Sequence, residues 1–385
     1  LAICVGLFGK IIKFYINLFK GLSLFFKMRQ YLALLEGILR GGDVVFEPRT
    51  KEYTIGLAGW QSIYNLEEGF PLTTTKKINP RLPFEELLWK LRGERSVKSL
   101  FERNVHIWDE NAFQHYLKRN NFENNVPKHS EEWEKEFIDY KKKLKEDPKA
   151  EELGDLGPVY GYQWRHGFKR NGEEIDQLKK TIDNIKKSPG SRYHLMSAWN
   201  PSDLPDSALG PCPLLHHFHA YGDKLDLHVY QRSCDSYLGV PFNIAQDCLF
   251  NHLVAKETGL KPRKFIHTYG NVHIYLGVPP RADFWTNIDN VREFQERFSE
   301  IKDEFGYLGL RSWYLQNSPE EDRLNKGKDH VPYVLEQLSN KPKSLPNVEL
   351  KDVNFWDAIN MKVGDIVEVK DYNPYEWDAK ARMAV

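Results

Sequence analysis

Residues 210–245 read GPCPLLHHFHAYGDKLDLHVYQRSCDSYLGVPFNIA, and this stretch decides the expected fold. Its β-rich runs LLHHFHAY and LDLHVY are separated by the turn residues Tyr221-Gly222-Asp223-Lys224. Runs of this kind around a glycine-containing turn are typical of neighbouring strands. Together with HLMSAW, which begins at His194, they predict an antiparallel sheet, and Asn243 to Glu257 predicts a buried helix after it.

The same stretch holds a candidate nucleophile. Cys212 lies between two prolines, upstream of Arg232. A cysteine attacks only as its thiolate, and a nearby guanidinium favours that charged form. Spacing alone leaves the alternative open, because a cysteine in an apolar stretch is usually inert packing.

Regular elements are also expected on both sides of this stretch. Helical spacing of apolar residues predicts a helix from Met28 to about Gly41 and a second from Leu82 to Leu91, which carries Glu86. Thr54 to Tyr64 alternates as a strand does, and Val348 to Val385 is expected to contain strand-like segments. We therefore expect one α+β domain over residues 28–385.

Two charged stretches are expected to be insertions in that domain. Residues 124–152 are dense in Lys and Glu with few apolar residues, which indicates a solvated helical insertion without a chemical role. Residues 292–330 form the second charged stretch.

The first 27 residues differ from the rest in being apolar and basic. Lys10, Lys13 and Lys20 interrupt the apolar run, which argues against a signal peptide and against stable membrane insertion. An amphipathic interfacial helix stays open as an alternative. We expect residues 1–27 to be an extension that adds nothing to function.

Charge and cysteine content narrow the class of protein. Lys+Arg and Asp+Glu both number 54, so no overall basic field is available to gather DNA. The four cysteines show neither a paired metal spacing nor a disulfide-rich density. We expect a cytoplasmic protein without a bound metal.

Motifs along most of the chain point to one family. The run at 210–245 is followed by HTYGNVHIY, and other matches are EPRTKEYTIG, FPLTTTKK, EELLWKLRG, NVHIWDENA, GDLGPVYGYQWRH, SAWNPSDLP and the terminal ARMAV. In this order they closely resemble the thymidylate synthase family. The resemblance implies an α+β three-layer domain whose large mixed β-sheet forms the interface of an obligate homodimer.

The resemblance also implies a reaction. Cys212 would add to C6 of 2′-deoxyuridylate (dUMP), and C5 would then attack the methylene group of 5,10-methylenetetrahydrofolate, the co-substrate. Glu86 would organise water and move protons at the pyrimidine O4. Asn243 would read uracil, because its amide offers both a donor and an acceptor.

Further site residues follow from the same resemblance. Arg49, Arg232 and Ser233 would bind the phosphate, with Arg192 supplied by the second subunit. The pair that would hold the deoxyribose 3′-hydroxyl is His273 and Tyr275. Positions around the folate and the reacting carbon are Trp108, Tyr160 and Asp235, and the tail ending at Val385 would close over the ligands.

Each assignment has a plainer alternative in the residues themselves. Glu86 could be a helix-surface charge like Glu85, and Asn243 a helix N-cap. The arginines could be ordinary surface residues, and His273 and Tyr275 two aromatic side chains on one face of a sheet.

Several positions depart from the family's pattern. Pro213 and His217 replace a usual histidine and glutamine, and His217 could perturb Cys212 or hydrogen-bond elsewhere. Tyr193 stands where the second arginine of a pair is usual, and Gln246-Asp247 replaces an uncharged pair. These departures leave open a pyrimidine nucleotide hydroxymethylase and, more remotely, a non-catalytic relative that binds nucleotide or RNA.

Overall fold

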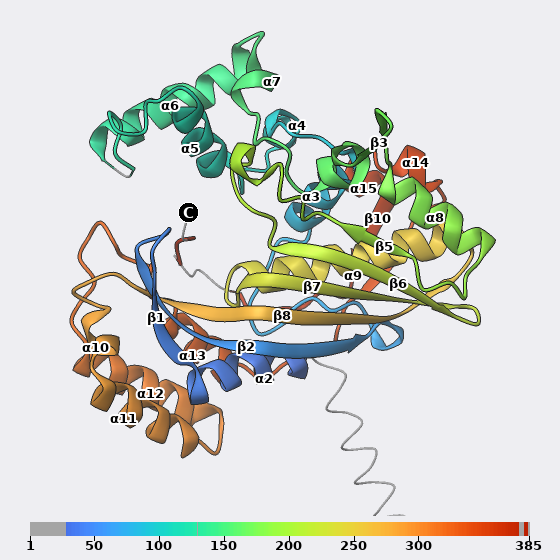
Figure 1. Ribbon diagram of the computed structural model, residues 1–385. Helices are drawn as coiled ribbons and strands as arrows, with labels where there is room; N and C mark the ends of the chain where they lie inside the picture. The colour runs from blue at the N-terminus through green and yellow to red at the C-terminus, as the bar shows by residue number, and fades with distance from the viewer. Residues whose placement is uncertain (1–27, 129, 377–380, 384–385) are drawn as a thin grey trace, which may run out of the picture.

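The computed structural model describes residues 28–128, 130–376 and 381–383 (Figure 1). The predictions made for residues 1–27 and for Val385 fall outside the described residues. None of the helices in the described part combines the length and the apolar character that a membrane crossing requires.

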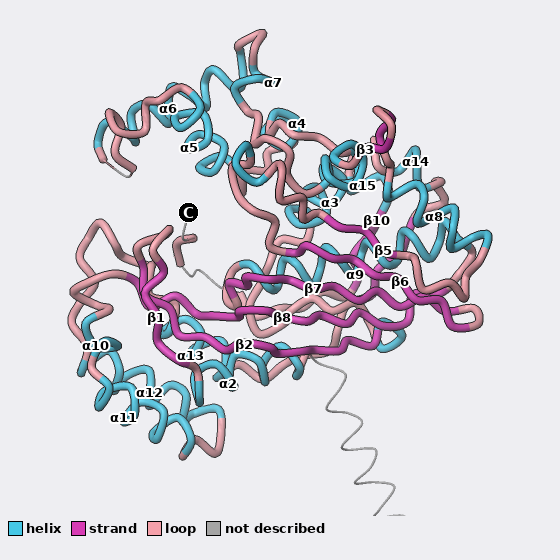
Figure 2. Tube along the Cα trace, viewed as in Figure 1, coloured by secondary structure: helices cyan, strands magenta, loops and turns pink. Residues whose placement is uncertain are grey.

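A six-stranded sheet forms the centre of the molecule and appears as one layer in Figure 2. Its strands, in spatial order, are β1 (Asp43–Glu47), β2 (Glu52–Asn65), β8 (Lys261–Gly277), β7 (Lys224–Asp235), β6 (Pro213–Tyr221) and β5 (Leu195–Ser197). β5, β6 and β7 pair antiparallel, as predicted from the sequence, but β7 and β8 pair parallel. The crossover helix between β7 and β8 explains the parallel pair. The predicted α+β class with a large mixed sheet is confirmed.

Several helices pack against this sheet or beside it. α2 (Arg29–Gly41) contacts β2, and α9 (Gly239–Thr258) contacts β7, β8 and α3 (Arg81–Arg92). α9 buries residues on all sides, as expected for a helix enclosed by protein. The helices predicted from apolar spacing at 28–41, 82–91 and 243–257 therefore exist, with small differences at their ends.

The opposite face of the sheet carries exposed apolar side chains. In Figure 1, α9 lies behind β6 and β7, so this face is turned toward the viewer. Exposed fractions are 43% for Leu195, 46% for Ile63, 58% for Tyr221 and 39% for Tyr230. Exposed apolar side chains gathered on one sheet face are typical of an interaction surface.

The charged stretch at 124–152 contributes to a hydrophobic core that it shares with neighbouring elements. Helix α6 (Glu131–Glu146) buries Trp133, Phe137, Tyr140 and Leu144 against α5 (Asp109–Arg119) and its neighbours. The expectation of a solvated helix is thus wrong for one face of α6, because apolar residues recur there at helical spacing. The same cluster contains Trp89, Trp108 and Tyr160, so the stretch supports the region where the site is expected.

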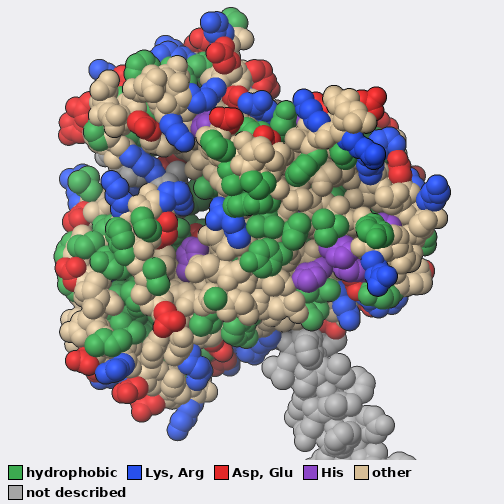
Figure 3. Space-filling model, in the orientation of Figure 1, with side chains coloured by type: hydrophobic (Ala, Val, Ile, Leu, Met, Phe, Trp, Pro, Cys, Tyr) green, Lys and Arg blue, Asp and Glu red, His purple; other side chains and the backbone are tan. Residues whose placement is uncertain are grey.

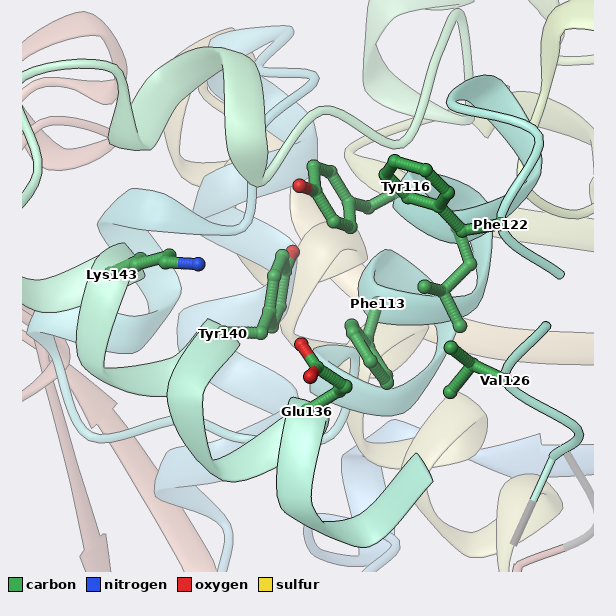
Figure 4. A pocket seen from close by; sticks show the side chains of 8 residues that line it. Phe113, Tyr116, Phe122, Val126, Glu136, Tyr140 and Lys143 are labelled. Carbon is green, nitrogen blue, oxygen red and sulfur yellow. The ribbon is translucent and has the colours of Figure 1, made fainter. Parts of the chain in front are cut away.

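A cavity of about 340 Å³ opens between α5 and α6 (Figure 4). Its wall is largely aromatic, from Phe113, Tyr116, Phe122 and Tyr140. It shares no lining residue with the cavities around Cys212 described below.

The second charged stretch and the tail also contain regular elements. Over 292–330, α11 (Ile288–Ser299) and α12 (Glu304–Asn317) bury aromatic residues such as Phe294, Phe298 and Tyr314. The tail holds two short helices as well as strands: β9 (Asn347–Leu350), α14 (Phe355–Ala358), α15 (Val363–Ile366) and β10 (Val367–Lys370). The remaining elements are η1 (Leu66–Glu68), α4 (Lys98–Glu102), α7 (Ala150–Leu153), η2 (Gln163–Gly167), β3 (Lys169–Arg170), β4 (Glu173–Glu174), α8 (Gln177–Lys187), η3 (Leu204–Asp206), α10 (Asp283–Thr286) and α13 (Val331–Ser339).

Candidate active site

Two adjoining cavities meet at Cys212. The larger, about 580 Å³, is called here the His273 cavity, and the other, about 350 Å³, the Glu86 cavity. Both are lined by Arg49, Leu209, Cys212, Ser233, Asp235, Gly239 and Met383. Figure 3 shows a hollow in this part of the surface, with Lys and Arg side chains at its rim. The shared wall makes the two cavities one site with Cys212 at the junction.

Cys212 precedes β6, and the start of that strand fixes its backbone. Its carbonyl accepts from the Arg232 N–H at 2.9 Å, and its own N–H donates to Tyr160 Oη at 3.1 Å. Arg232 Nη2 lies 4.0 Å from Cys212 Sγ, while the guanidinium also donates to Gly210 O and Pro211 O. The predicted cation beside the thiol is therefore present.

The other two described cysteines behave differently. Cys234 and Cys248 are fully buried, and burial raises the pKa of both thiols well above the usual range. Inert packing thus accounts for Cys234 and Cys248. It does not account for Cys212, which is partly exposed and lines both cavities.

Tyr160 closes one side of the Glu86 cavity. Burial raises the pKa of its phenol well above the usual range, so the group stays protonated. Since its oxygen accepts from the Cys212 N–H, its own O–H proton is left to donate elsewhere.

Glu86 lies on α3 and is 7% exposed. Its carboxylate accepts from Trp108 Nε1 and from Gln246 Nε2, both at 2.9 Å, and lies 3.1 Å from Lys90 Nζ. The alternative of a helix-surface charge is wrong for Glu86 and also for Glu85, which is 3% exposed and pairs with Arg103 at 2.8 Å.

Asn243 is oriented by two residues behind it. Gln231 Nε2 donates to Asn243 Oδ1 at 3.1 Å, and His267 Nε2 lies 2.9 Å from Gln231 Oε1. Burial lowers the pKa of His267 to about 3, so its ring is neutral and donates through Nε2. The helix N-cap alternative is wrong, because α9 begins at Gly239 with Leu238 at the cap position.

His273 and Tyr275 lie on β8 and face the same cavity, as their spacing predicts. Their ring centroids are 5.1 Å apart, and His273 Nδ1 lies 2.7 Å from Asn271 Oδ1. Burial lowers the pKa of His273 and raises that of Tyr275, so both are neutral near pH 7. Two neutral hydrogen-bonding groups at a cavity wall suit a hydroxyl ligand.

The predicted anion-binding residues fall into two groups. Arg49 and Ser233 line both cavities, and Arg232 lines the His273 cavity. Arg192, in the loop between α8 and β5, is exposed and lines neither. Its neighbour Tyr193 is 87% exposed.

Asp235 and the described end of the chain complete the wall. Asp235 Oδ1 accepts from the N–H groups of Tyr237 and Leu238 at 2.9 and 3.1 Å. Met383 lines both cavities, and its neighbour Arg382 accepts from His330 Nε2 at 2.9 Å through its carbonyl. In Figure 1 this segment lies between the α5–α6 region and β1.

Several site residues were missed from the sequence or given no role there. Lys90, Gln231 and His267 were not singled out, and Gln246 was noted only as a departure. Lys90 carried a usable signal, since it is a lysine inside an apolar helical run, four residues after Glu86. Of the two options for His217, the structure shows the second: its Nε2 hydrogen-bonds to Arg192 O at 3.1 Å, and it lines neither cavity.

No group of three or more His, Cys, Asp or Glu side chains suited to a metal ion occurs among the residues that the structure describes.

Comparison with known proteins adds sequence relatives to this geometry. The family model described as thymidylate synthase matches residues 29–385. The chain belongs to the thymidylate synthase family. It is 40% identical over 260 residues to the thymidylate synthase of Listeria monocytogenes serotype 4a, an alignment that covers 64% of this chain and 82% of that protein.

Two further members of the thymidylate synthase family show the same extent of similarity. The thymidylate synthase of Mycoplasma genitalium is 45% identical over 249 residues, covering 64% of this chain and 81% of the relative. That of Mesoplasma florum is 45% identical over 251 residues, covering 65% and 82%. The predicted family and the predicted class of enzyme, a methyltransferase, are confirmed, and the relatives' names favour methylation over hydroxymethylation.

Proposed function

We propose that this member of the thymidylate synthase family converts dUMP to thymidylate with 5,10-methylenetetrahydrofolate, using Cys212 as the nucleophile. The observation that carries the proposal is the position of Cys212 Sγ, at the junction of two cavities and 4.0 Å from Arg232 Nη2. This places a guanidinium beside the sulfur that would attack the substrate.

The first bond forms between Cys212 Sγ and C6 of the pyrimidine. The C5–C6 electron pair then moves toward C5 and O4, so C5 becomes the nucleophile. Donors at the O4 side stabilise the charge that develops there. When the cleft holds the reduced folate, this co-substrate supplies the one-carbon unit and the hydride.

The cavity walls fit the two ligands. The Glu86 cavity includes Ile107, Trp108, Leu238 and Phe242, an apolar and aromatic surface suited to flat heterocycles. The His273 cavity offers Arg232 and Arg49 for a phosphate, and His273 with Tyr275 for a sugar hydroxyl.

Asn243 distinguishes uracil from cytosine in this proposal. Since Gln231 donates to Asn243 Oδ1, the Nδ2 group faces away from that contact and donates to O4, while the second lone pair of Oδ1 accepts the N3 hydrogen. Cytosine presents an amine and an unprotonated N3 at these positions, so both contacts would be lost.

We propose further that the enzyme is a homodimer in which Arg192 reaches the partner's phosphate site. Two observations support this. The sheet face bearing Leu195, Tyr221 and Tyr230 is exposed and apolar, and Arg192 lies directly beside it, where its carbonyl accepts from His217 on β6. Arg192 lines neither cavity of its own subunit. In a dimer formed through this face, we expect Arg192 to bind the phosphate in the partner's cavity.

Covalent trapping tests the role of Cys212. Incubation with 5-fluoro-dUMP and methylenetetrahydrofolate is expected to yield a protein adduct whose mass includes both ligands and maps to Cys212. The Cys212→Ser variant is expected to give no adduct, while Cys234→Ser, which changes a buried thiol outside the cavities, is expected to react. An adduct on another residue would overturn the assignment.

A further inference from the structure

Lys90 is a buried lysine in the wall of the Glu86 cavity. It is 3% exposed, and its Nζ lies 3.1 Å from Glu86 Oε1 and 2.7 Å from Gln246 Oε1. Gln246 Nε2 in turn donates to Glu86 Oε2 at 2.9 Å. These three side chains, two from α3 and one from α9, form a closed triangle in which each contacts the other two.

The triangle receives one further donor from this cavity, because Trp108 Nε1 donates to Glu86 Oε1 at 2.9 Å. Pro213, which lines the same cavity, has no N–H to offer. The Lys90 ammonium also lies 4.5 Å from the centroid of the Tyr160 ring, and the Tyr160 oxygen accepts from the Cys212 backbone. The Lys90 ammonium therefore contacts both the Glu86 carboxylate and Tyr160, the residue that hydrogen-bonds to the Cys212 backbone.

The energetics show what the lysine does to Glu86. A buried carboxylate is costly unless it is paired and hydrogen-bonded. Lys90, Gln246 and Trp108 pair with the Glu86 carboxylate, and both of its oxygens are held in place. Gln246 cannot replace the lysine, because an amide donates without carrying charge.

We propose that Lys90 is a positioning residue for the methylation reaction, acting through Glu86: it keeps the Glu86 carboxylate ionised and aimed so that it can accept and return protons near the pyrimidine O4. This role rests on the proposed function. Gln246 on α9 hydrogen-bonds to both Lys90 and Glu86. The departure from the family's pattern at Gln246 therefore contributes to the same positioning.

The surroundings leave Lys90 and Glu86 as a separate ion pair. The other ionisable groups that line the same cavity are Arg49, Tyr160, Cys212 and Asp235. The charged groups on the neighbouring elements have partners of their own: Glu85 with Arg103 at 2.8 Å, and Asp247 with His216 at 3.0 Å.

The test is steady-state kinetics on Lys90→Met across pH 5 to 9, with Lys179→Met as the control. Lys179 is 60% exposed and also pairs with an acid four residues away, Asp183, so its loss is expected to change neither rate nor pH profile. For Lys90→Met we expect kcat to fall by about tenfold or more with little change in the KM for dUMP. The acid limb of the profile should move about one pH unit or more upward, because a buried carboxylate without its cation is harder to ionise.

Lys90→Arg separates charge from packing. It keeps the cation, so it is expected to restore the acid limb toward its original pH and to recover part of kcat. Thermal unfolding of each variant verifies the fold. If Lys90→Met does not fold, the acid limbs of the pH profiles of Lys90→Arg and Gln246→Ala are compared with that of the wild type instead. An acid limb that stays in place in folded Lys90→Met, or in Gln246→Ala where Lys90→Met does not fold, overturns the role of Lys90. A wild-type chain that makes no thymidylate overturns the proposed function instead.

Discussion

At the scale of single residues, the site depends on polar groups that fix one another. Gln231 orients Asn243 by donating a hydrogen bond to it, and the neutral ring of His267 orients Gln231 in the same way. A buried hydrogen-bond chain of this kind is costly to leave half-satisfied. Under the proposed function, base recognition therefore depends on Gln231 and His267 as well as on Asn243.

Asn243→Asp tests that recognition. The substituted carboxylate accepts at both positions and cannot donate to O4, so kcat/KM for dUMP is expected to fall by about tenfold to a hundredfold, the loss expected for one unpaired contact to substrate. Steady-state rates with dUMP and with 2′-deoxycytidylate measure the change in preference. The control is Asn317→Asp, at the exposed end of α12, where no change is expected. Retained uracil preference would contradict the recognition role.

Lys76 provides a residue-level test of stability. Its ammonium donates to Tyr237 O and lies 3.6 Å from the centroid of the Tyr237 ring, and burial lowers its pKa to about 7. An unfolded lysine titrates near 10.4. Between these values the unfolded chain binds the proton and the folded chain does not, so stability gains up to about 1.4 kcal/mol per pH unit as pH rises.

Lys76→Met is expected to remove that gain. Urea unfolding at pH 7, 8.5 and 10 measures the free energy of unfolding of wild type and variant. The difference between the two free energies is expected to grow with pH. Lys77→Met is the matched control, because Lys77 is half exposed in a surface pair with Glu376. A pH-independent difference for Lys76→Met would contradict the role assigned to its burial.

At the scale of elements, the core of α5 and α6 makes a clear prediction. Trp133 on α6 packs against Phe113 on α5, with ring centroids 5.3 Å apart, in the cluster that also contains Trp108. Trp133→Ala is expected to cost about 3–5 kcal/mol of unfolding free energy, the usual range for a buried tryptophan. Ile138→Ala, on the same helix but 65% exposed, should change stability by about 0.5 kcal/mol or less. Equal effects in chemical denaturation would show that α6 is not packed as described.

Long elements were predictable from the sequence because their patterns are local. α2, α3 and β2 follow apolar periodicity over ten or more residues, and α9 is a long run that is mostly apolar. The four-residue helices α14 and α15 were not predicted, since tertiary contacts decide such short elements. The Lys90–Gln246 hydrogen bond joins residues 156 positions apart, and no local pattern in the sequence indicates it.

At the scale of the whole molecule, a shared site between two subunits follows if Arg192 serves the partner. Mixing Arg192→Ala with Cys212→Ala subunits should then restore activity, because one of the two sites in a mixed dimer has both its own Cys212 and the partner's Arg192. Random pairing places mixed dimers at about half of all dimers, so roughly a quarter of wild-type activity is expected. Activity of the separate variants and of the mixture measures this, and a mixture no more active than its parts would rule out the shared site.

The central claim is that the cleft around Cys212 methylates dUMP. The most direct measurement is mass analysis of the nucleotide formed from dUMP and methylenetetrahydrofolate, beside a Cys212→Ser control. Thymidylate with dihydrofolate, and no product from the control, is the predicted result. Hydroxymethyl-dUMP with tetrahydrofolate, or unchanged dUMP from the wild-type chain, would contradict it.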